Sequence, residues 1–318
     1  MREGNGGDKV ERNLLIVHTP AVEDIADWQS VKARIDERAP DIETRIVNNR
    51  LADAAMAAWQ VTRPSLLFSP HELRNFAPRG GKVYAGRAYD KLQQFDRLVS
   101  AGLPTPATMA LAPDFQPEPD WGSLLVVKPV NGKFGADVRL VRAVDLTRRF
   151  AELTGDGQRR MIVQPFVEHV DEAGRPCDFR ILLVFGRPIY ATRNRWPVRR
   201  APIDAVAEDP DGLVASNSQT PGRPIRELLS DETALGLAGK AAAAFPEIPV
   251  LAVDIVRENK TGAYVILEVN PRGESWHLSS NFAKHTFTPG HRAELYEQFG
   301  ALDVVAEALI EKTRGEAS

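Results

Sequence analysis

The chain has 318 residues, which is more than one minimal core needs and suits two or three compact lobes. Its 40 Lys and Arg residues nearly balance its 43 Asp and Glu residues, and the formal net charge of -3 excludes a global field that would attract nucleic acid or a membrane surface. The single cysteine, Cys177, excludes an intrachain disulfide and a cysteine-cluster metal site.

No stretch of the sequence approaches the roughly 20 consecutive apolar residues that a membrane helix needs. Residues 1–8 are polar and glycine-rich, unlike the apolar segment of a secretory signal. A lone cysteine fits a reducing compartment. We therefore expect a cytoplasmic protein that binds neither nucleic acid nor a membrane.

The first 85 residues alternate between strand-like and helix-like segments. Their expected elements are a strand at 14–17, a helix at 22–35, a strand at 42–46, a helix at 51–60 and a strand at 66–68. Because this order favours a parallel sheet, we expect an open α/β lobe over residues 1–85. His71 and Glu72 follow the third strand, at the sheet edge where ligands often bind.

After residue 86 the pattern changes to short strands joined by turn signals. Expected strands lie at 124–127, 138–141, 161–167, 180–185, 189–192, 251–256 and 265–269. Most of them are hairpin-like, so we expect this part of the chain to be α+β with antiparallel-rich sheets. Residues 193–226 are rich in Arg, Pro, Gly and Asp, and we expect them to form one long loop.

Two carboxylates each interrupt an otherwise apolar strand, Asp254 and Glu268. A turn centred near Thr261 sets Asp254 opposite Glu268, with Asn270 two residues further along on the same face. Facing carboxylates repel, and a divalent cation resolves the repulsion, because Mg²⁺ prefers carboxylate and amide oxygens. Three alternatives stay open: one carboxylate points to solvent, each carboxylate pairs with a nearby arginine, or the register differs by one residue and Asp254 faces the other way.

Lys128 ends a run of four apolar residues, so a strand that we expect to be buried delivers its ammonium group. The hairpin that follows carries Gly132 and Gly135 near its tip, where backbone N–H groups could bind phosphate. An ordinary glycine-containing turn is the alternative. The segment is not a Walker A loop, because no Ser or Thr follows the Gly132-Lys133 pair.

Asp178 and Arg180 flank Phe179 at the start of an apolar strand and therefore share a face. An arginine at that position could bind phosphate with two hydrogen bonds, and a local salt bridge at a strand end is the alternative. Gln164 precedes a proline that ends another strand, which frees backbone groups that could bind an adenine edge or simply mark the edge of a sheet.

Taken together and in order, these segments resemble the ATP-grasp superfamily. The motifs are Asp90-Lys91-Leu92, Gly102-Leu103-Pro104-Thr105-Pro106, Val127-Lys128-Pro129 with its glycine loop, Val163-Gln164-Pro165-Phe166-Val167-Glu168, Asp178-Phe179-Arg180, Asp254, and Glu268-Val269-Asn270-Pro271-Arg272. The resemblance covers residues 86–282. It implies an N-terminal α/β lobe at 1–85, a small lobe at 86–160, and a large lobe with the metal site at 161–318.

The resemblance also implies a role for each matching residue. Lys91, Lys128, Gly132 and Gly135 would contact ATP phosphates, Gln164, Phe166 and Val167 would bind adenine, and Glu168, Asp171 and Glu172 compete to hold the ribose. Asn217 would lie near the γ-phosphate, and Asp254, Glu268 and Asn270 would hold Mg²⁺, as two ions. Arg180, Arg272 and Lys128 would carry the chemistry by neutralising charge on the transferring phosphoryl group.

The activity implied by this resemblance is that of an ATP- and Mg²⁺-dependent carboxylate–amine ligase, closer to glutathione-synthetase-like and ribosomal-protein glutamate ligases than to biotin carboxylases. Such an enzyme converts a carboxylate into an acyl-phosphate, which an amine then attacks. Its substrates would be a small carboxylate and an amine, of the amino-acid or peptide type, and the protein would be a homodimer or homotetramer. Another acyl-phosphate enzyme, of the carboxylase or purine-pathway type, and a non-catalytic ATP-binding regulator are the alternatives.

Overall fold

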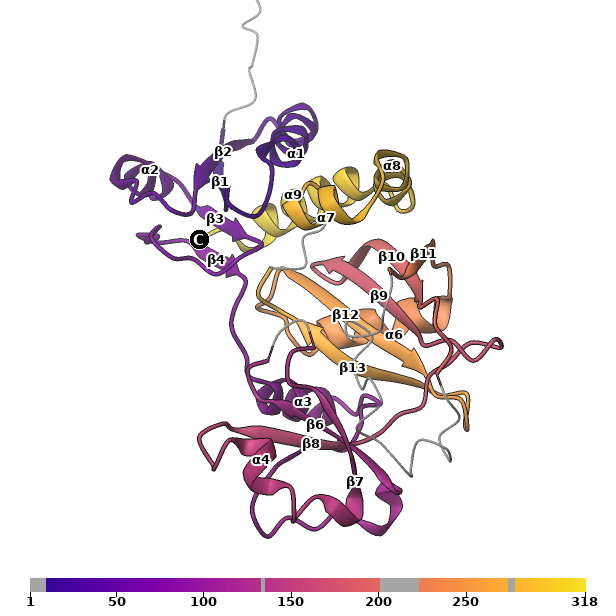
Figure 1. Ribbon diagram of the computed structural model, residues 1–318. Coiled ribbons are helices and arrows are strands. Elements are labelled where there is room, and N and C mark those ends of the chain that lie inside the picture. The colour runs from indigo at the N-terminus through magenta and orange to yellow at the C-terminus, as the bar shows by residue number, and fades with distance from the viewer. Residues whose placement is uncertain (1–9, 133–134, 201–222, 274–277) are drawn as a thin grey trace, which may run out of the picture.

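The computed structural model describes residues 10–132, 135–200, 223–273 and 278–318. Three separate sheets follow one another along the chain (Figure 1). The first has the order β2-β1-β3-β4, the second β5-β8-β6-β7 and the third β11-β10-β9-β12-β13. This mixed α/β and α+β architecture confirms the fold class expected from the sequence.

The first sheet is parallel throughout and forms the N-terminal lobe. Its elements are β1 (Arg12–His18), α1 (Ile25–Arg38), β2 (Ile42–Asn48), α2 (Ala54–Gln60), β3 (Ser65–Ser69) and β4 (Lys82–Ala85). The apolar run of β1 is buried on both faces, as a central parallel strand requires. The sequence pattern did not indicate β4, because this short edge strand leaves Lys82 and Val83 exposed.

The second sheet is antiparallel and belongs to the small lobe. The elements of this part are α3 (Lys91–Ser100), β5 (Met109–Ala110), β6 (Leu124–Pro129), β7 (Arg139–Arg142), α4 (Phe150–Thr154) and β8 (Met161–Pro165), with single 3₁₀ turns at Pro119–Trp121 and Ala143–Asp145. The division of the chain at 85/86 and 160/161 stays a prediction. Strand β8, which that division gives to the large lobe, pairs with β6 in the small-lobe sheet.

The third sheet is antiparallel and carries the large lobe. Its elements are β9 (Cys177–Val184), β10 (Arg187–Arg195), β11 (Ile225–Leu228), α6 (Glu232–Ala243), β12 (Val250–Arg257) and β13 (Tyr264–Asn270). Alternate residues of β9 and β12, such as Phe179 and Ile255, pack with the alanines of α6 in one apolar cluster. The residues between them, Arg180 and Asp254 among them, therefore project from the opposite face.

The expectation of one long loop at 193–226 is wrong at both ends of that stretch. Strand β10 continues through Arg195, and Arg226 lies within β11, which pairs with β10. The apolar pattern that predicted this strand ends before the strand does, because the last four residues of β10 are all polar: Thr192, Arg193, Asn194 and Arg195. Residues 201–222 lie outside the described part of the chain.

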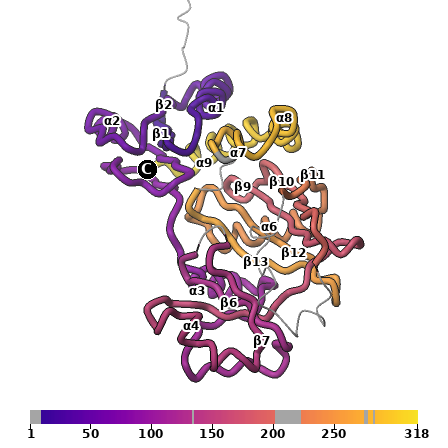
Figure 2. The backbone as a smooth tube through the Cα atoms, viewed as in Figure 1, coloured from indigo at the N-terminus to yellow at the C-terminus, as the bar shows by residue number. Residues whose placement is uncertain are grey.

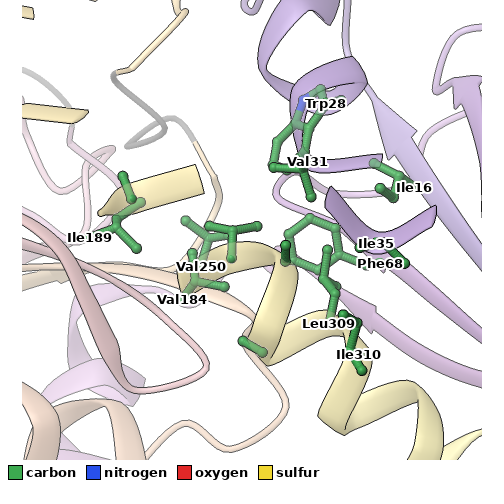
Figure 3. Packing of buried hydrophobic residues seen from close by; sticks show 14 of the residues in the cluster. Ile16, Trp28, Val31, Ile35, Phe68, Val184, Ile189, Val250, Leu309 and Ile310 are labelled. Carbon is green, nitrogen blue, oxygen red and sulfur yellow. The ribbon is translucent and has the colours of Figure 1, made fainter. Parts of the chain in front are cut away.

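The C-terminal helices return to the N-terminal lobe (Figure 1, Figure 2). They are α7 (Asn281–Thr286), α8 (Pro289–Glu297) and α9 (Ala301–Glu316). Trp28 and Phe68 of the first lobe, Leu309 of α9 and Val250 of the large lobe share a single apolar core (Figure 3). The two lobes are thus packed together through α9. No helix in the described residues is long and apolar enough to span a membrane.

Candidate functional site

Asp254 on β12 and Glu268 on β13 face each other across the hairpin, as the sequence predicts. Near the turn Ile255 pairs with Ile266, and the register then shifts by one residue, so that Asp254 pairs with Glu268. Without this shift Glu268 would project from the opposite face, because successive strand residues alternate faces. The shift therefore brings both carboxylates to the face that lies opposite α6.

Side chains from both neighbouring strands hold the Asp254 carboxylate. Arg180 Nη1 donates to its two oxygens at 2.8 and 3.0 Å, and Asn270 Nδ2 donates to Oδ2 at 3.0 Å. Burial raises the pKa of Asp254 to about 6, and it outweighs the Arg180 guanidinium, which acts to lower that pKa. The arginine pairing that the sequence left open is therefore present, and Asn270 lies within hydrogen-bonding distance of the same group.

Glu268 is paired with a buried lysine from a different part of the chain. Lys91 Nζ lies 2.5 Å from Glu268 Oε1. Burial alone would raise the pKa of Glu268, but the ammonium groups of Lys91 and Lys128 hold that pKa below its usual value. Lys91 begins α3, directly after the N-capping Asp90, and its backbone N–H donates to the Val130 carbonyl at 3.1 Å. This bond ties α3 to the hairpin after β6.

Lys128 lies on β6 in the small-lobe sheet, and its Nζ is 5.3 Å from the centroid of the Phe95 ring. Burial, together with the neighbouring Lys91 ammonium, lowers the pKa of Lys128 to about 8, although the carboxylates of Glu268 and Asp254 oppose the shift. Of the two lysines that the sequence singled out, Lys91 thus contacts Glu268, and Lys128 lies close enough to both carboxylates to interact with their charges.

The donor set at the hairpin suits a hard cation. Asp254, Glu268 and Asn270 supply carboxylate and amide oxygens from one sheet face, which is the chemistry that Mg²⁺ prefers. Among the described residues no group of three or more His, Cys, Asp or Glu side chains is arranged to hold a metal ion. The set therefore contains two carboxylates and depends on Asn270 and on oxygens from a ligand for a full coordination shell.

The expected adenine hinge lies where β8 ends and the chain crosses to the large lobe (Figure 1). Gln164 is buried, and its side-chain amide donates to Thr108 Oγ1 at 2.6 Å. The Phe166 ring lies 6.4 Å from the His169 ring and has the Arg200 guanidinium over it at 5.3 Å. The Val167 carbonyl lies 2.7 Å from His169 Nδ1. The side chain of Gln164 is thus engaged within the small lobe.

The three candidate ribose carboxylates differ in their surroundings. Asp171 Oδ1 accepts from the backbone N–H groups of Ala173 and Arg175, both at 2.9 Å, and its side chain is only 2% exposed. Asp171 therefore stabilises a turn. Asp171 and Glu172 also line a cavity of about 340 Å³ that Phe179 borders, on the α6 side of the sheet. Glu168 is partly buried and does not border that cavity.

Arg272 lies where the N-terminal lobe meets the end of β13. Its Nη2 donates to Glu72 Oε2 at 2.9 Å. Gly273 makes this contact possible, because it has φ +75° and a Cβ at this residue would lie 1.7 Å from the Pro70 carbonyl oxygen. The segment after β3, which the sequence suggested as a ligand-binding edge, is therefore packed directly against the end of the carboxylate hairpin.

One expected site residue, Asn217, lies outside the described part of the chain. Gly132 and Gly135 are described and flank residues 133–134, which are not. Gly135 has φ +68°, a conformation that favours glycine in the turn between β6 and β7.

Sequence reasoning missed a group of polar residues on β10 and β11. Asn194 Nδ2 donates to Asp178 Oδ1 at 2.6 Å, and the register places Thr192 beside Arg180. Tyr190 is almost fully buried next to Arg180, and burial raises its pKa, although the Arg180 guanidinium opposes the shift. The sequence feature that could have revealed them is the polar residue at every second position of β10, a pattern that is typical of a strand with one functional face.

A scan against protein-family models and a search of curated proteins give no match. Solved structures do match over almost the whole chain. The structure of the ATP-grasp ligase PsnB complexed with minimal precursor is 19% identical, with a TM-score of 0.56, and the match covers 96% of this chain and 100% of that chain. The D-cycloserine synthetase DcsG is 17% identical, with a TM-score of 0.52 and coverage of 95% and 99%.

This chain has the ATP-grasp fold. PsnB was also solved with minimal precursor, Mg and ADP, in a structure that is 18% identical to this chain over 94% of its length and 97% of that chain, with a TM-score of 0.55. At these identities the likeness is one of fold. It confirms the ATP-grasp architecture expected from the order of the motifs, with the N-terminal α/β lobe included.

Proposed function

We propose that this protein is an ATP- and Mg²⁺-dependent ligase that activates a substrate carboxylate and joins it to an amine. The observation that carries the proposal is the single cluster of Asp254, Glu268 and Asn270 with Arg180 and Lys91. Two carboxylates, an amide and two cations are suited to a metal–phosphate complex. The shared fold with a ligase solved with Mg and ADP supports it.

In this proposal the oxygens of Asp254, Glu268 and Asn270 hold Mg²⁺, which neutralises phosphate oxygens when bound. The number of ions, two by resemblance, stays a prediction. Arg180 and Lys91 now pair with the carboxylates. When metal and phosphate are bound, both cations are free to contact phosphate oxygens instead, because the metal takes over the neutralisation of the carboxylates.

The nucleotide would extend from these groups towards the hinge between the lobes. Lys128 would contact phosphates from the small-lobe sheet, with the backbone at Gly132 and Gly135 above them. The hinge at 164–167 would bind adenine, with Phe166 and Val167 nearest to it. For the ribose we propose Glu168, because Asp171 stabilises a turn and both Asp171 and Glu172 border the cavity on the α6 side.

The proposed reaction has two steps. A substrate carboxylate oxygen attacks the γ-phosphorus of ATP, and the bond to ADP breaks, giving an acyl-phosphate. The amine nitrogen then attacks the acyl carbon, inorganic phosphate leaves and the nitrogen loses a proton. Arg180, Lys128 and Arg272 would stabilise the negative charge in both steps. Arg272 would exchange its bond with Glu72 for a bond to the reacting group.

The substrates would be a small carboxylate and an amine of the amino-acid or peptide type. PsnB was also solved in complex with the precursor peptide PsnA2 and AMPPNP, which supports peptides among the possible substrates of this chain. A carboxylase or purine-pathway reaction is the second enzyme class. The presence of both lysines and the whole oxygen set argues against a non-catalytic regulator. A homodimer or homotetramer stays a prediction.

The proposal is tested by measuring ADP release from ATP and MgCl₂ with pools of amino acids, other carboxylic acids and amines. We expect ADP only when a matching acid and amine are both present. Glu268→Gln should abolish turnover, while Glu258→Gln, at the exposed turn of the same hairpin, should retain it. Tight ATP binding without ADP release in any pool would contradict the proposal, and bicarbonate-dependent release would favour the carboxylase class.

A further inference from the structure

A row of polar residues crosses the large-lobe sheet on the face of the candidate site. Arg226 on β11 pairs with Asn194 on β10, and Asn194 pairs with Asp178 on β9. Directly paired residues share a face, and Arg180 lies two residues beyond Asp178 on that same face. Arg226 therefore projects from the face that carries Arg180 and Asp254.

Arg226 differs from the other arginine on this face in its partners. Arg180 binds Asp254 with two hydrogen bonds. No carboxylate of a described residue forms an ion pair with Arg226, and its guanidinium lies 5.2 Å from the centroid of the Phe287 ring. Asp178, the acidic residue in its row, instead accepts from Asn194 at 2.6 Å. Arg226 is thus a partly buried cation that lacks an acidic partner among the described residues.

The surroundings of Arg226 call for an anion. Burial lowers its pKa, and the nearby guanidinium groups of Arg180 and Arg223 lower it further, against the opposing effect of Asp178 and Tyr190. Partly buried arginines are normally paired, because removing a charge from water without a partner is costly. A planar guanidinium binds a carboxylate with two parallel hydrogen bonds.

The position of Arg226 separates it from the metal and the lysines. The strand order is β11-β10-β9-β12-β13, so Arg226 lies at one edge while Asp254 and Glu268 lie on the last two strands at the other. Arg180, on β9, stands between them. Two strand spacings across the sheet and two residues along it separate the backbones at Arg226 and Arg180 by about 12 Å, a span that two extended arginine side chains and a short dicarboxylate can bridge.

We propose that Arg226 binds a second acidic group of the substrate, so that the acid activated beside Arg180 is a dicarboxylate. This inference rests on the proposed function and narrows its substrate class. One carboxylate lies at Arg180, where it is activated, and the other lies at Arg226, where it is only held. Arg226 is in this view a residue that selects the substrate.

A binding measurement in the presence of ADP and MgCl₂, under which Arg180 is released from Asp254, tests the subsite directly. Malonate, succinate and glutarate are each compared with the corresponding half-amide, which has the same length but one carboxylate fewer, by calorimetric titration of the full-length protein. We expect at least one dicarboxylate to bind about tenfold more tightly than its half-amide, the effect of one charge-assisted pair. Arg226→Gln should remove the difference, and Arg226→Lys should restore part of it.

Arg187→Gln is the matched control, because Arg187 lies at the other end of β10 and pairs with Glu311 at the surface. The Arg187→Gln variant loses the same charge as Arg226→Gln and should keep the preference for a dicarboxylate over its half-amide. Equal binding of every acid and its half-amide by the wild type, or a preference that survives Arg226→Gln, would overturn the inference. ADP release with monocarboxylic acids alone would also overturn it while leaving the ligase function standing. Absence of ADP release with every acid would instead contradict the ligase function.

Discussion

Asp254 stands opposite Glu268 only because the register between β12 and β13 shifts by one residue after Ile255. The shift places two carboxylates on one face, each beside a different cation: Arg180 for Asp254 and Lys91 for Glu268. Each carboxylate is stabilised without metal by a cation that a bound metal ion can replace. The hairpin therefore combines a folded apo state with a site for Mg²⁺ and phosphate.

The pair of Lys91 and Glu268 should couple energetically in the protein without nucleotide. Lys91→Met and Glu268→Gln are each expected to lower the free energy of unfolding, because each leaves the other charge without its partner. The double variant should lose less than the sum of the two, with a coupling of about 1 kcal/mol, since the Glu268 side chain is about a third exposed. Urea titrations of the wild type, the two single variants and the double variant measure this coupling. Strictly additive losses in the free energy of unfolding would contradict the pairing.

The raised pKa of Asp254 predicts how Mn²⁺, as a probe for Mg²⁺, should bind at different pH values. Protonated Asp254 cannot ligate a metal, so affinity should be half-maximal near pH 6, approach its full value about one unit above, and fall by up to tenfold per unit below. Electron paramagnetic resonance of free Mn²⁺ between pH 5 and 7.5 measures the affinity. Asp254→Asn should show weak binding with little pH dependence across this range. A wild-type affinity that stays constant down to pH 5 would contradict the assignment.

The lowered pKa of Lys128 predicts a lysine that titrates near pH 8. Its folded-state pKa lies below the unfolded value of 10.5, so Lys128 should be charged below pH 8 and lose its proton as the pH rises through that value. Nuclear magnetic resonance of ¹³C-methylated lysines measures this, with Lys128→Arg used to assign the signal. Adding ADP should raise the pKa, because phosphate favours the ammonium form. A Lys128 signal that titrates above pH 10 would exclude the burial described here.

Gly273 should be required for docking of the N-terminal lobe on the hairpin. Gly273→Ala would force a Cβ into the Pro70 carbonyl and a positive φ on alanine, so we expect a loss of about 2 kcal/mol or more in the free energy of unfolding. Gly290→Ala is the control, because a Cβ there meets no atom within 4 Å. Thermal unfolding compares the two variants. Equal stability would show that the close approach to Pro70 is not needed.

The strand and helix order of the N-terminal lobe could be predicted, because its apolar runs and helical spacing are strong signals. The pairing of Asp254 with Glu268 could be predicted from polar residues that interrupt apolar strands. The bulge that makes this pairing possible could not, because a one-residue register shift leaves no compositional mark. The strand β11 was also missed, since Arg226 and Glu227 sit in a segment whose composition is typical of a loop.

The partners of the charged residues could not be predicted. Lys91 and Glu268 are far apart in the sequence, and only the packing of α3 against the hairpin brings them within 2.5 Å. The contact of Arg272 with Glu72 depends on the docking of two lobes, which no local pattern encodes. The ATP-grasp fold could be predicted, because the order of the motifs extends over a long part of the chain and does not depend on any single local pattern.

The carboxylate hairpin is proposed to activate an acid as an acyl-phosphate. Hydroxylamine attacks acyl-phosphates, so the protein is incubated with ATP, MgCl₂, hydroxylamine and a mixture of aspartate, glutamate, succinate and glutarate. We predict that ADP and hydroxamate form in equal amounts, that both require Mg²⁺, and that both are lost in Glu268→Gln and retained in Glu258→Gln. Hydroxamate formation that Glu268→Gln leaves unchanged, or ADP release without any hydroxamate, would contradict the account.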